Sequence, residues 1–263
     1  MTVIVERHPI PTVDEQVTAR LAQEFETSIQ NLDASPAIVG MALNEALLQV
    51  QVHQALNPTG NRFGTWDATV SAMQVGSAAF AAASITEGSL EVRISHERRT
   101  ISATGPQFYA NAGNWLTTLW FVIICRDQPR MNEICRVPLD LWLRRPDVAD
   151  KLISAIEMSN PEVAHSHPQD LLQGLLYPPI NLFHTFVRKN VDGFGPALAE
   201  ALNLHKSYWT LTEERAEDID GAVALGPLAM ACLAYDGKLP IDVESPFIPK
   251  YLVEHGWLGE FPT

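Results

Sequence analysis

The chain has 263 residues and a formal net charge of −13, from 18 Lys and Arg residues against 31 Asp and Glu residues. Hydrophobic residues make up 46% of the chain and charged residues 19%, which is typical of a globular protein with a sizeable core rather than of a disordered or fibrous chain. Binding to nucleic acid or to anionic membranes requires clusters of Lys and Arg, so we expect neither partner. A basic protein partner would be favoured.

The cysteines and the apolar runs bear on the cellular compartment. Cys125, Cys135 and Cys232 are an odd number without C-x-x-C spacing, so they predict neither a disulfide framework nor a structural zinc site. The longest apolar run, residues 115–125, is about half the roughly 20 residues that a membrane-spanning helix needs. The first residues lack the basic and apolar regions of a secretory signal. These features predict a cytoplasmic protein, and none of them indicates a cofactor.

The first part of the chain has helical periodicity. Over residues 12–32 apolar residues recur every three or four positions, and Thr12 and Glu15 have the spacing of a capping box. A second helix, apolar on most sides, is predicted over residues 35–56, with proline at its first helical position. A third is expected over residues 65–84, where glycine, serine and alanine would let a neighbouring helix approach closely.

The pattern then changes to a period of two. Leu90, Val92 and Ile94 alternate with polar residues, which predicts a β-hairpin over residues 90–102. Two strands are marginally stable alone, so we expect the hairpin to lie on the helical body. Residues 107–126 return to a helical pattern rich in aromatic side chains, which predicts a second central helix.

Prolines divide the second half into shorter expected helices, because proline lacks an amide donor and opposes the preceding turn. Boundaries are expected at Pro178-Pro179 and at Pro196, among others. The predicted helices span residues 147–158, 169–176, 181–189, 196–208 and 228–235, and a last short helix ends near Glu254. The fold expected from the whole pattern is mainly α, a multi-helix globular bundle with one small β-hairpin. We expect a single helical domain over residues 1–263 that could divide into a looser N-terminal half, 1–126, and a C-terminal half, 127–263.

Negative charge is concentrated near the C-terminus. Residues 211–263 hold ten acidic residues against three basic ones. Such a run is either a solvated surface or a surface that attracts a cationic partner, since complementary fields accelerate encounter. The second interpretation needs aromatic anchors beside the carboxylates. The candidate partner-binding residues are Asp236, Asp242, Glu244, Glu260, Tyr208, Trp209, Tyr251 and Trp257.

Motifs of catalysis are missing from the sequence. It contains no G-x-G-x-x-G, P-loop, G-x-S-x-G, H-E-x-x-H or EF-hand pattern, although catalytic groups can also be assembled from distant positions. His165 and His167 would bind a metal only with further ligands that the sequence does not place, so no metal site is predicted. The alternative function is a small-molecule enzyme or binding protein with a pocket between helices. Its candidate catalytic residues are His205, Tyr208, Glu244 and His255.

Four segments near the C-terminus carry a longer pattern. They read ALNLHKSYW (201–209), VALGPLAMACLAYD (223–236), VESPFIPKYL (243–252) and WLGEFPT (257–263). Together they resemble the immunity protein 49 family over about residues 195–263. The resemblance implies a helical, cytoplasmic, bacterial protein of a polymorphic toxin system that neutralises a toxin by direct binding, without catalysis. It transfers no individual site residue and identifies neither the toxin, the face that would bind it nor the oligomeric state.

Overall fold

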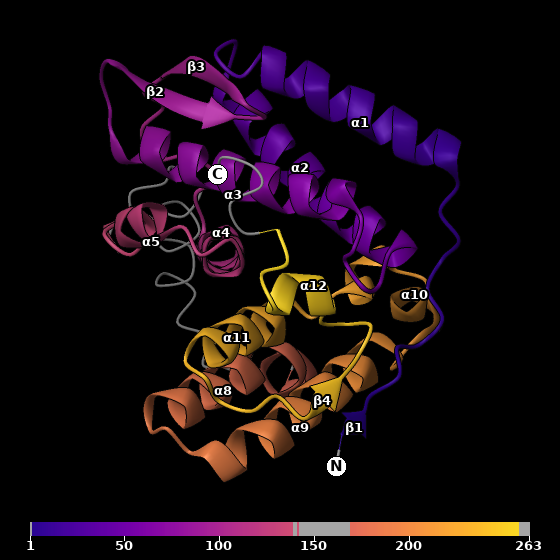
Figure 1. The fold of residues 1–263 in the computed structure, drawn as a ribbon. Helices are drawn as coiled ribbons and strands as arrows, with labels where there is room; N and C mark the ends of the chain where they lie inside the picture. Colours follow the sequence, from indigo (N-terminus) through magenta and orange to yellow (C-terminus); the bar gives the residue numbers. More distant parts are fainter. Residues whose placement is uncertain (1, 139–140, 142–168, 258–263) are drawn as a thin grey trace, which may run out of the picture.

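The computed structural model describes residues 2–138, 141 and 169–257. The predicted helix over residues 147–158, the pair His165 and His167, and Glu260 lie outside the described residues. The described chain is mainly α-helical, as the sequence predicts, with two small sheets of two strands each (Figure 1).

The elements follow one another as two groups. The first group contains β1 (Val3–Ile4), α1 (Glu15–Gln30), α2 (Pro36–Leu56), α3 (Phe63–Ser84), β2 (Ser89–Ile94), β3 (Glu97–Ser102), α4 (Ala112–Ile124) and α5 (Gln128–Ile134). The second contains α7 (Gln169–Leu171), η3 (Leu172–Leu176), α8 (Tyr177–Val187), α9 (Val191–Trp209), α10 (Glu213–Ala216), η4 (Ile219–Ala222), α11 (Leu225–Asp236), β4 (Val243–Glu244) and α12 (Lys250–Val253). In Figure 1, α4 lies between the two groups, and it contacts α3 on one side and α11 on the other.

The first helix begins differently from the sequence prediction. The side chain of Asp14 accepts a hydrogen bond from the Val17 amide at 2.7 Å, so Asp14 is the N-cap and the expected capping box of Thr12 and Glu15 is wrong. Asp is among the best N-cap residues, which explains why it is used here in place of Thr12. The second helix starts with Pro36 at its first position, as predicted.

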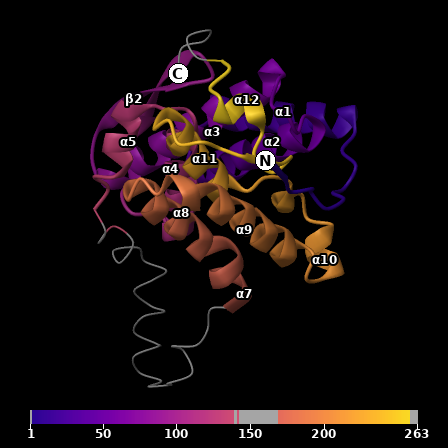
Figure 2. The ribbon, with the colours of Figure 1, turned by 60° about the horizontal axis from the view of Figure 1, so that its bottom comes forward.

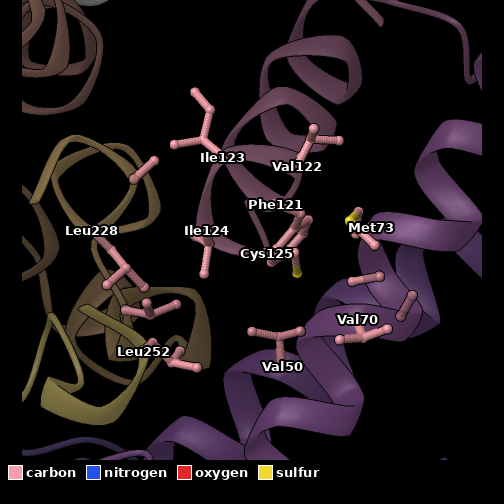
Figure 3. Packing of buried hydrophobic residues seen from close by; sticks show 14 of the residues in the cluster. Val50, Val70, Met73, Phe121, Val122, Ile123, Ile124, Cys125, Leu228 and Leu252 are labelled. Carbon is pink, nitrogen blue, oxygen red and sulfur yellow. The ribbon is translucent and has the colours of Figure 1, made fainter. Parts of the chain in front are cut away.

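The core is built where α3, α4 and α11 meet. Gly76 of α3 lies so close to α4 that a Cβ added to it would come within 2.5 Å of the Thr118 Oγ1 atom, which confirms the expected tight packing of the small residues. Figure 3 shows side chains from α2, α3 and α4 facing Leu228 of α11 and Leu252 of α12. Buried residues of both groups belong to one hydrophobic cluster.

The predicted hairpin is present as β2 and β3, which pair antiparallel with Ser89 opposite Ser102. Ile94 and Ile101 are buried against the helices. The Ser95 amide donates to Oε1 of Gln74 in α3 at 2.9 Å, and the Ser102 amide donates to Oδ1 of Asp33 at 2.8 Å. The hairpin is therefore fixed to the helical body at both ends.

Two predicted proline boundaries are wrong. Residues 169–187 form one continuous helical run, α7–η3–α8, in which Pro178 and Pro179 occupy the first turn of α8 after a π turn. Pro196 lies inside α9, which begins at Val191 because the Asn190 side chain caps it by accepting from the Gly193 amide at 3.0 Å. Pro178 and Pro179 directly follow the wider π turn of η3, and Pro196, the sixth residue of α9, removes only the one bond that its own amide would donate, so both helical runs continue through their prolines. Figure 2 shows α7 leading into α8, beside α9.

The second sheet was not predicted, and it corrects the expectation of a single hairpin. β1 pairs in parallel with β4, with Val3 opposite Val243 and Ile4 opposite Glu244. The Val3 amide donates to the Asp242 carbonyl at 2.8 Å and the Val5 amide to the Glu244 carbonyl at 3.0 Å. Figure 1 shows the two strands side by side. This pair joins the start of the chain to its acidic C-terminal part.

One stretch among the described residues, 219–236, is apolar and long enough to cross a membrane by length and composition alone. It comprises η4, a turn and α11, and 67% of it is buried inside the protein. Core helices commonly have this composition.

Candidate functional site

A groove with a volume of about 880 Å³ lies beside the β1–β4 pair. Its other walls come from the end of α11, from α12 and from the loop between α2 and α3. Its apolar lining includes Ile4, Tyr235, Ile241, Ile248 and Val253, with Pro58, Pro240 and Pro246. The charged residues of the lining are Glu6, Glu244, Glu254, Lys238 and Lys250.

The pleat of the two strands places one apolar and two acidic side chains together. Ile4, the last residue of β1, and Glu6 both line the groove, whereas Val5 between them is buried, so the alternation of a strand continues two residues past β1. Glu244 is the cross-strand partner of Ile4. All three line the groove, and Ile4 remains 66% exposed although it is a large apolar residue.

The segment that follows β1 is held firmly, which fixes Ile4 and Glu6 in place. The Arg7 guanidinium donates to the carbonyls of Gln54 and Ala55 at 3.3 Å and to that of Ala222 at 3.4 Å. His8 is buried, and its ring centre lies 5.8 Å from that of Phe247. Burial, and then the positive charges of Arg7 and Lys206, lower the pKa of His8 and so favour its neutral form.

The charges of the groove differ in whether they are already neutralised. Nζ of Lys250 lies 3.7 Å from Oε1 of Glu254, and Nζ of Lys238 lies 5.6 Å from the ring centre of Tyr235. In contrast, Glu6 and Glu244 form no ion pair with any residue that the structure describes, and neither does Asp242 beside the groove. The lining therefore holds three carboxylates against two lysines, and Glu6 and Glu244 outnumber Lys238 among its charges that have no ion pair with a described residue.

The family model described as Immunity protein 49 matches residues 57–252. The chain belongs to the immunity protein 49 family. The match covers most of the chain and extends far beyond the segment of about residues 195–263 on which the resemblance rested. No curated protein and no solved structure matches the chain. In this member of the immunity protein 49 family, Asp242 and Glu244 lie within the matched residues, whereas Ile4 and Glu6 precede them.

The predicted acidic residues of this family member have different surroundings. Asp242 and Glu244 are exposed on β4 and next to it. Asp236 is also exposed, but its Oδ2 atom lies 3.0 Å from Nε of Arg126. Arg126 in turn donates to the carbonyls of Leu252 at 2.8 Å and Val253 at 2.6 Å, so Asp236 belongs to a structural contact between α4, α11 and α12.

The predicted aromatic residues divide into two places. Tyr251 is exposed on α12, and its amide donates to the carbonyl of Thr59 at 3.0 Å. Nε1 of the half-buried Trp257 donates to the Gly60 carbonyl at 3.2 Å. Both lie near the groove loop formed by Pro58 and Thr59, whereas Tyr208 and Trp209 are on α9 and do not line the groove.

The two α9 aromatics have close neighbours within the protein. The guanidinium of Arg215 lies 4.2 Å from the ring centre of Tyr208, and Arg215 also pairs with Asp170 at 2.6 Å. Trp209 is half-buried, and a Cβ added to Gly221 would lie 3.0 Å from its ring. These contacts indicate packing roles for both residues.

The candidate catalytic residues are not brought into one constellation. His205 is 5% exposed, and its Nε2 atom lies 3.2 Å from the Gly221 carbonyl oxygen. Its ring centre lies 4.9 Å from that of Phe247. Burial lowers the pKa of His205 to about 4. His255 packs beside Trp66, with 6.0 Å between ring centres. Neither histidine lines the groove, and across the described residues no hydrogen bond joins either of them to Glu244.

Metal ligation can be assessed only for the described residues, in which no group of three or more His, Cys, Asp or Glu residues could hold a metal ion.

Sequence reasoning missed Ile4 and Glu6 as site residues. The one local signal was the short apolar run Val3-Ile4-Val5, and a strand of two residues lies below the length at which alternation can be recognised.

Proposed function

We propose that this immunity protein 49 family member neutralises a basic protein toxin of a bacterial polymorphic toxin system by binding it directly, without catalysing a reaction. The observation that carries the proposal is the group of unpaired carboxylates, Glu6, Asp242 and Glu244, around the exposed Ile4 at the groove. We further propose that binding takes place in the cytoplasm, with no nucleic acid or membrane as partner.

The two kinds of side chain contribute different parts of the binding. Unpaired carboxylates attract a cationic surface over about a Debye length and so raise the association rate. An apolar side chain such as Ile4 loses contact with water only when the partner covers it, which slows dissociation. A carboxylate that already pairs with a cation, such as Asp236 with Arg126, contributes less to the external field.

The test co-expresses the chain with candidate toxins, scores rescue of growth, and then measures complex formation by surface plasmon resonance at several salt concentrations. The double variant Asp242→Lys and Glu244→Lys is expected to lower the association rate constant at least about tenfold at low salt. The matched control, Glu87→Lys with Glu91→Lys, makes the same change of net charge at exposed positions on and beside the hairpin. It should lower the rate constant less than about threefold.

Two results would contradict the proposal. If the association rate constant does not change with salt, the acidic groove is not the binding surface. The same conclusion follows if the two double variants lower the rate constant equally. Rescue of growth without a complex, together with turnover of a toxic small molecule, would favour the enzyme function instead.

A further inference from the structure

The groove has a shape and a lining that restrict what the partner can place in it. Its volume of about 880 Å³ lies within the range of preformed ligand sites, so a few residues of another chain would fill it. Three prolines, Pro58, Pro240 and Pro246, form part of its walls, and proline fixes the backbone φ angle. The groove is therefore largely formed before any partner arrives.

The spacing of side chains on β1 defines a pattern of neighbouring sites. β1 ends at Ile4, and the Val5 amide continues the pairing by donating to the Glu244 carbonyl at 3.0 Å, so Ile4 and Glu6, two residues apart, have Cα atoms roughly 7 Å apart. An extended segment lying along β1 has the same repeat, so its side chains j and j+2 can meet Ile4 and Glu6 in register. On a helix the side chains that share a face are three or four residues apart, so a spacing of two residues between the apolar and the cationic side chain is specific to an extended segment.

The charges of the groove define which side chains fit. Glu244 lies across from Ile4, so the Cα atoms of Glu6 and Glu244 are roughly 8 Å apart on the diagonal. A long cationic side chain can reach both carboxylates from between them. Of the two lysines of the lining, Lys250 pairs with Glu254, whereas Lys238 lies beside the Tyr235 ring and keeps its charge, so the carboxylates near Ile4 exceed the free cations of the groove by one.

We propose that the groove binds an extended segment of the partner protein that places an apolar side chain on Ile4 and, two residues away, a lysine or arginine between Glu6 and Glu244. The inference rests on the proposed function and specifies the chemistry of the partner at that site. It explains why an isoleucine stays exposed beside two carboxylates: each group has its complement on the partner.

The experiment uses a short peptide, acetyl-Lys-Thr-Leu-Thr-Lys-amide, and the full chain labelled at the isoleucine δ1 methyl groups. The peptide has a lysine two residues to either side of its leucine, so it fits in either chain direction. Three isoleucines, Ile4, Ile241 and Ile248, line the groove and report binding. Ile29 of α1 and Ile94 of the hairpin lie in other elements and serve as internal controls.

Saturable shifts confined to the three groove methyls are expected, with a dissociation constant on the order of 1 mM for so small a ligand. The charge-reversed peptide acetyl-Glu-Thr-Leu-Thr-Glu-amide should bind at least about tenfold more weakly, because its carboxylates oppose those of the groove. The rearranged peptide acetyl-Lys-Lys-Thr-Thr-Leu-amide, with the same composition, should bind at least about threefold more weakly because its spacing is wrong.

Variants of the protein test the carboxylates themselves. Glu6→Gln with Glu244→Gln removes two charges and keeps the side-chain shapes, so the methyl spectrum of the core should not change, and peptide affinity should fall about tenfold. The matched control Glu87→Gln with Glu91→Gln should leave the affinity unchanged. Equal binding of the three peptides, or shifts that avoid the groove methyls, would overturn the inference.

Failure of this inference can be distinguished from failure of the proposed function. If a toxin complex forms and depends on Asp242 and Glu244 while no peptide moves the groove methyls, the toxin binds this face in another way and only the inference is lost. If the peptides bind with the expected ranking while no toxin complex forms, the groove recognises such segments and the proposed function is lost.

Discussion

Arg126 follows α4 and connects it to α11 and α12, and removing its guanidinium should destabilise the fold. The side chain is only 12% exposed, and it donates to the carbonyls of Leu252 and Val253 while its Nε pairs with Asp236. Arg126→Met keeps the apolar stem and removes every donor. The carbonyl of Leu252 still accepts from the His255 amide at 3.3 Å, whereas that of Val253 loses the guanidinium donor.

Hydrogen bonds from a charged donor contribute about 1.5–3 kcal/mol each, so the loss of those to Leu252 and Val253 in Arg126→Met should lower the free energy of unfolding by roughly 3–6 kcal/mol. Urea-induced unfolding, followed by tryptophan fluorescence and circular dichroism, measures this change from the midpoint and the slope. The fluorescence signal is available because the chain has six tryptophans.

Asp236→Asn is the control, since it removes only the carboxylate end of the contact. The Asp236 side chain is 42% exposed, so this loss should be at most about 1 kcal/mol. If both variants lose the same free energy, the ion pair rather than the carbonyl contacts holds α12, and the reasoning is refuted. A loss below about 1 kcal/mol for Arg126→Met would refute it as well.

Two further predictions concern packing and pH. Gly76→Ala should lower the free energy of unfolding by about 2 kcal/mol because the new Cβ meets the buried Thr118; urea unfolding of the variant checks this. Because the pKa of His205 is about 4 in the folded protein and 6.5 ordinarily, the unfolded chain binds more protons between these values, so stability is complete above pH 6.5 and declines toward pH 4. The decline from pH 7 to pH 5 should be about 2 kcal/mol and smaller in His205→Gln, and equal stability at both pH values would contradict it.

The sequence predicted the long helices and the hairpin because their periodicity is local. The stretches over residues 35–56 and 65–84 appear as α2 and α3 with boundaries shifted by two residues at most. Leu90, Val92 and Ile94 indicated the hairpin through simple alternation. In these segments the residues of a single element show which of its side chains are buried, so the prediction needs no knowledge of distant contacts.

The errors arise where tertiary contacts or capping determine the outcome. Pro196 was expected to start a helix, but a cap at Asn190 and the burial of Phe194 extend α9 backward past it. The β1–β4 pair consists of two residues on each strand, and its stability depends on anchors such as Arg7, which donates to carbonyls far along the chain.

The candidate site was predicted in part for the same reason. Asp242 and Glu244 were identified from the local excess of acidic residues, and both are exposed at or beside the groove. Asp236 belongs to the same acidic run, yet Arg126 lies beside it, and the sequence gives no indication of that partner. Ile4 and Glu6 could not be selected because only the pairing with β4 makes them neighbours of Glu244.

The parallel pairing of Val3 with Val243 also has a consequence for biosynthesis. The partner strand β4 is synthesised about 240 residues after β1. At about 5–20 residues per second, that delay is on the order of ten to fifty seconds, during which the N-terminal segment has no strand to join. Until β4 has been synthesised, a nascent chain cannot present Ile4 and Glu6 beside Glu244.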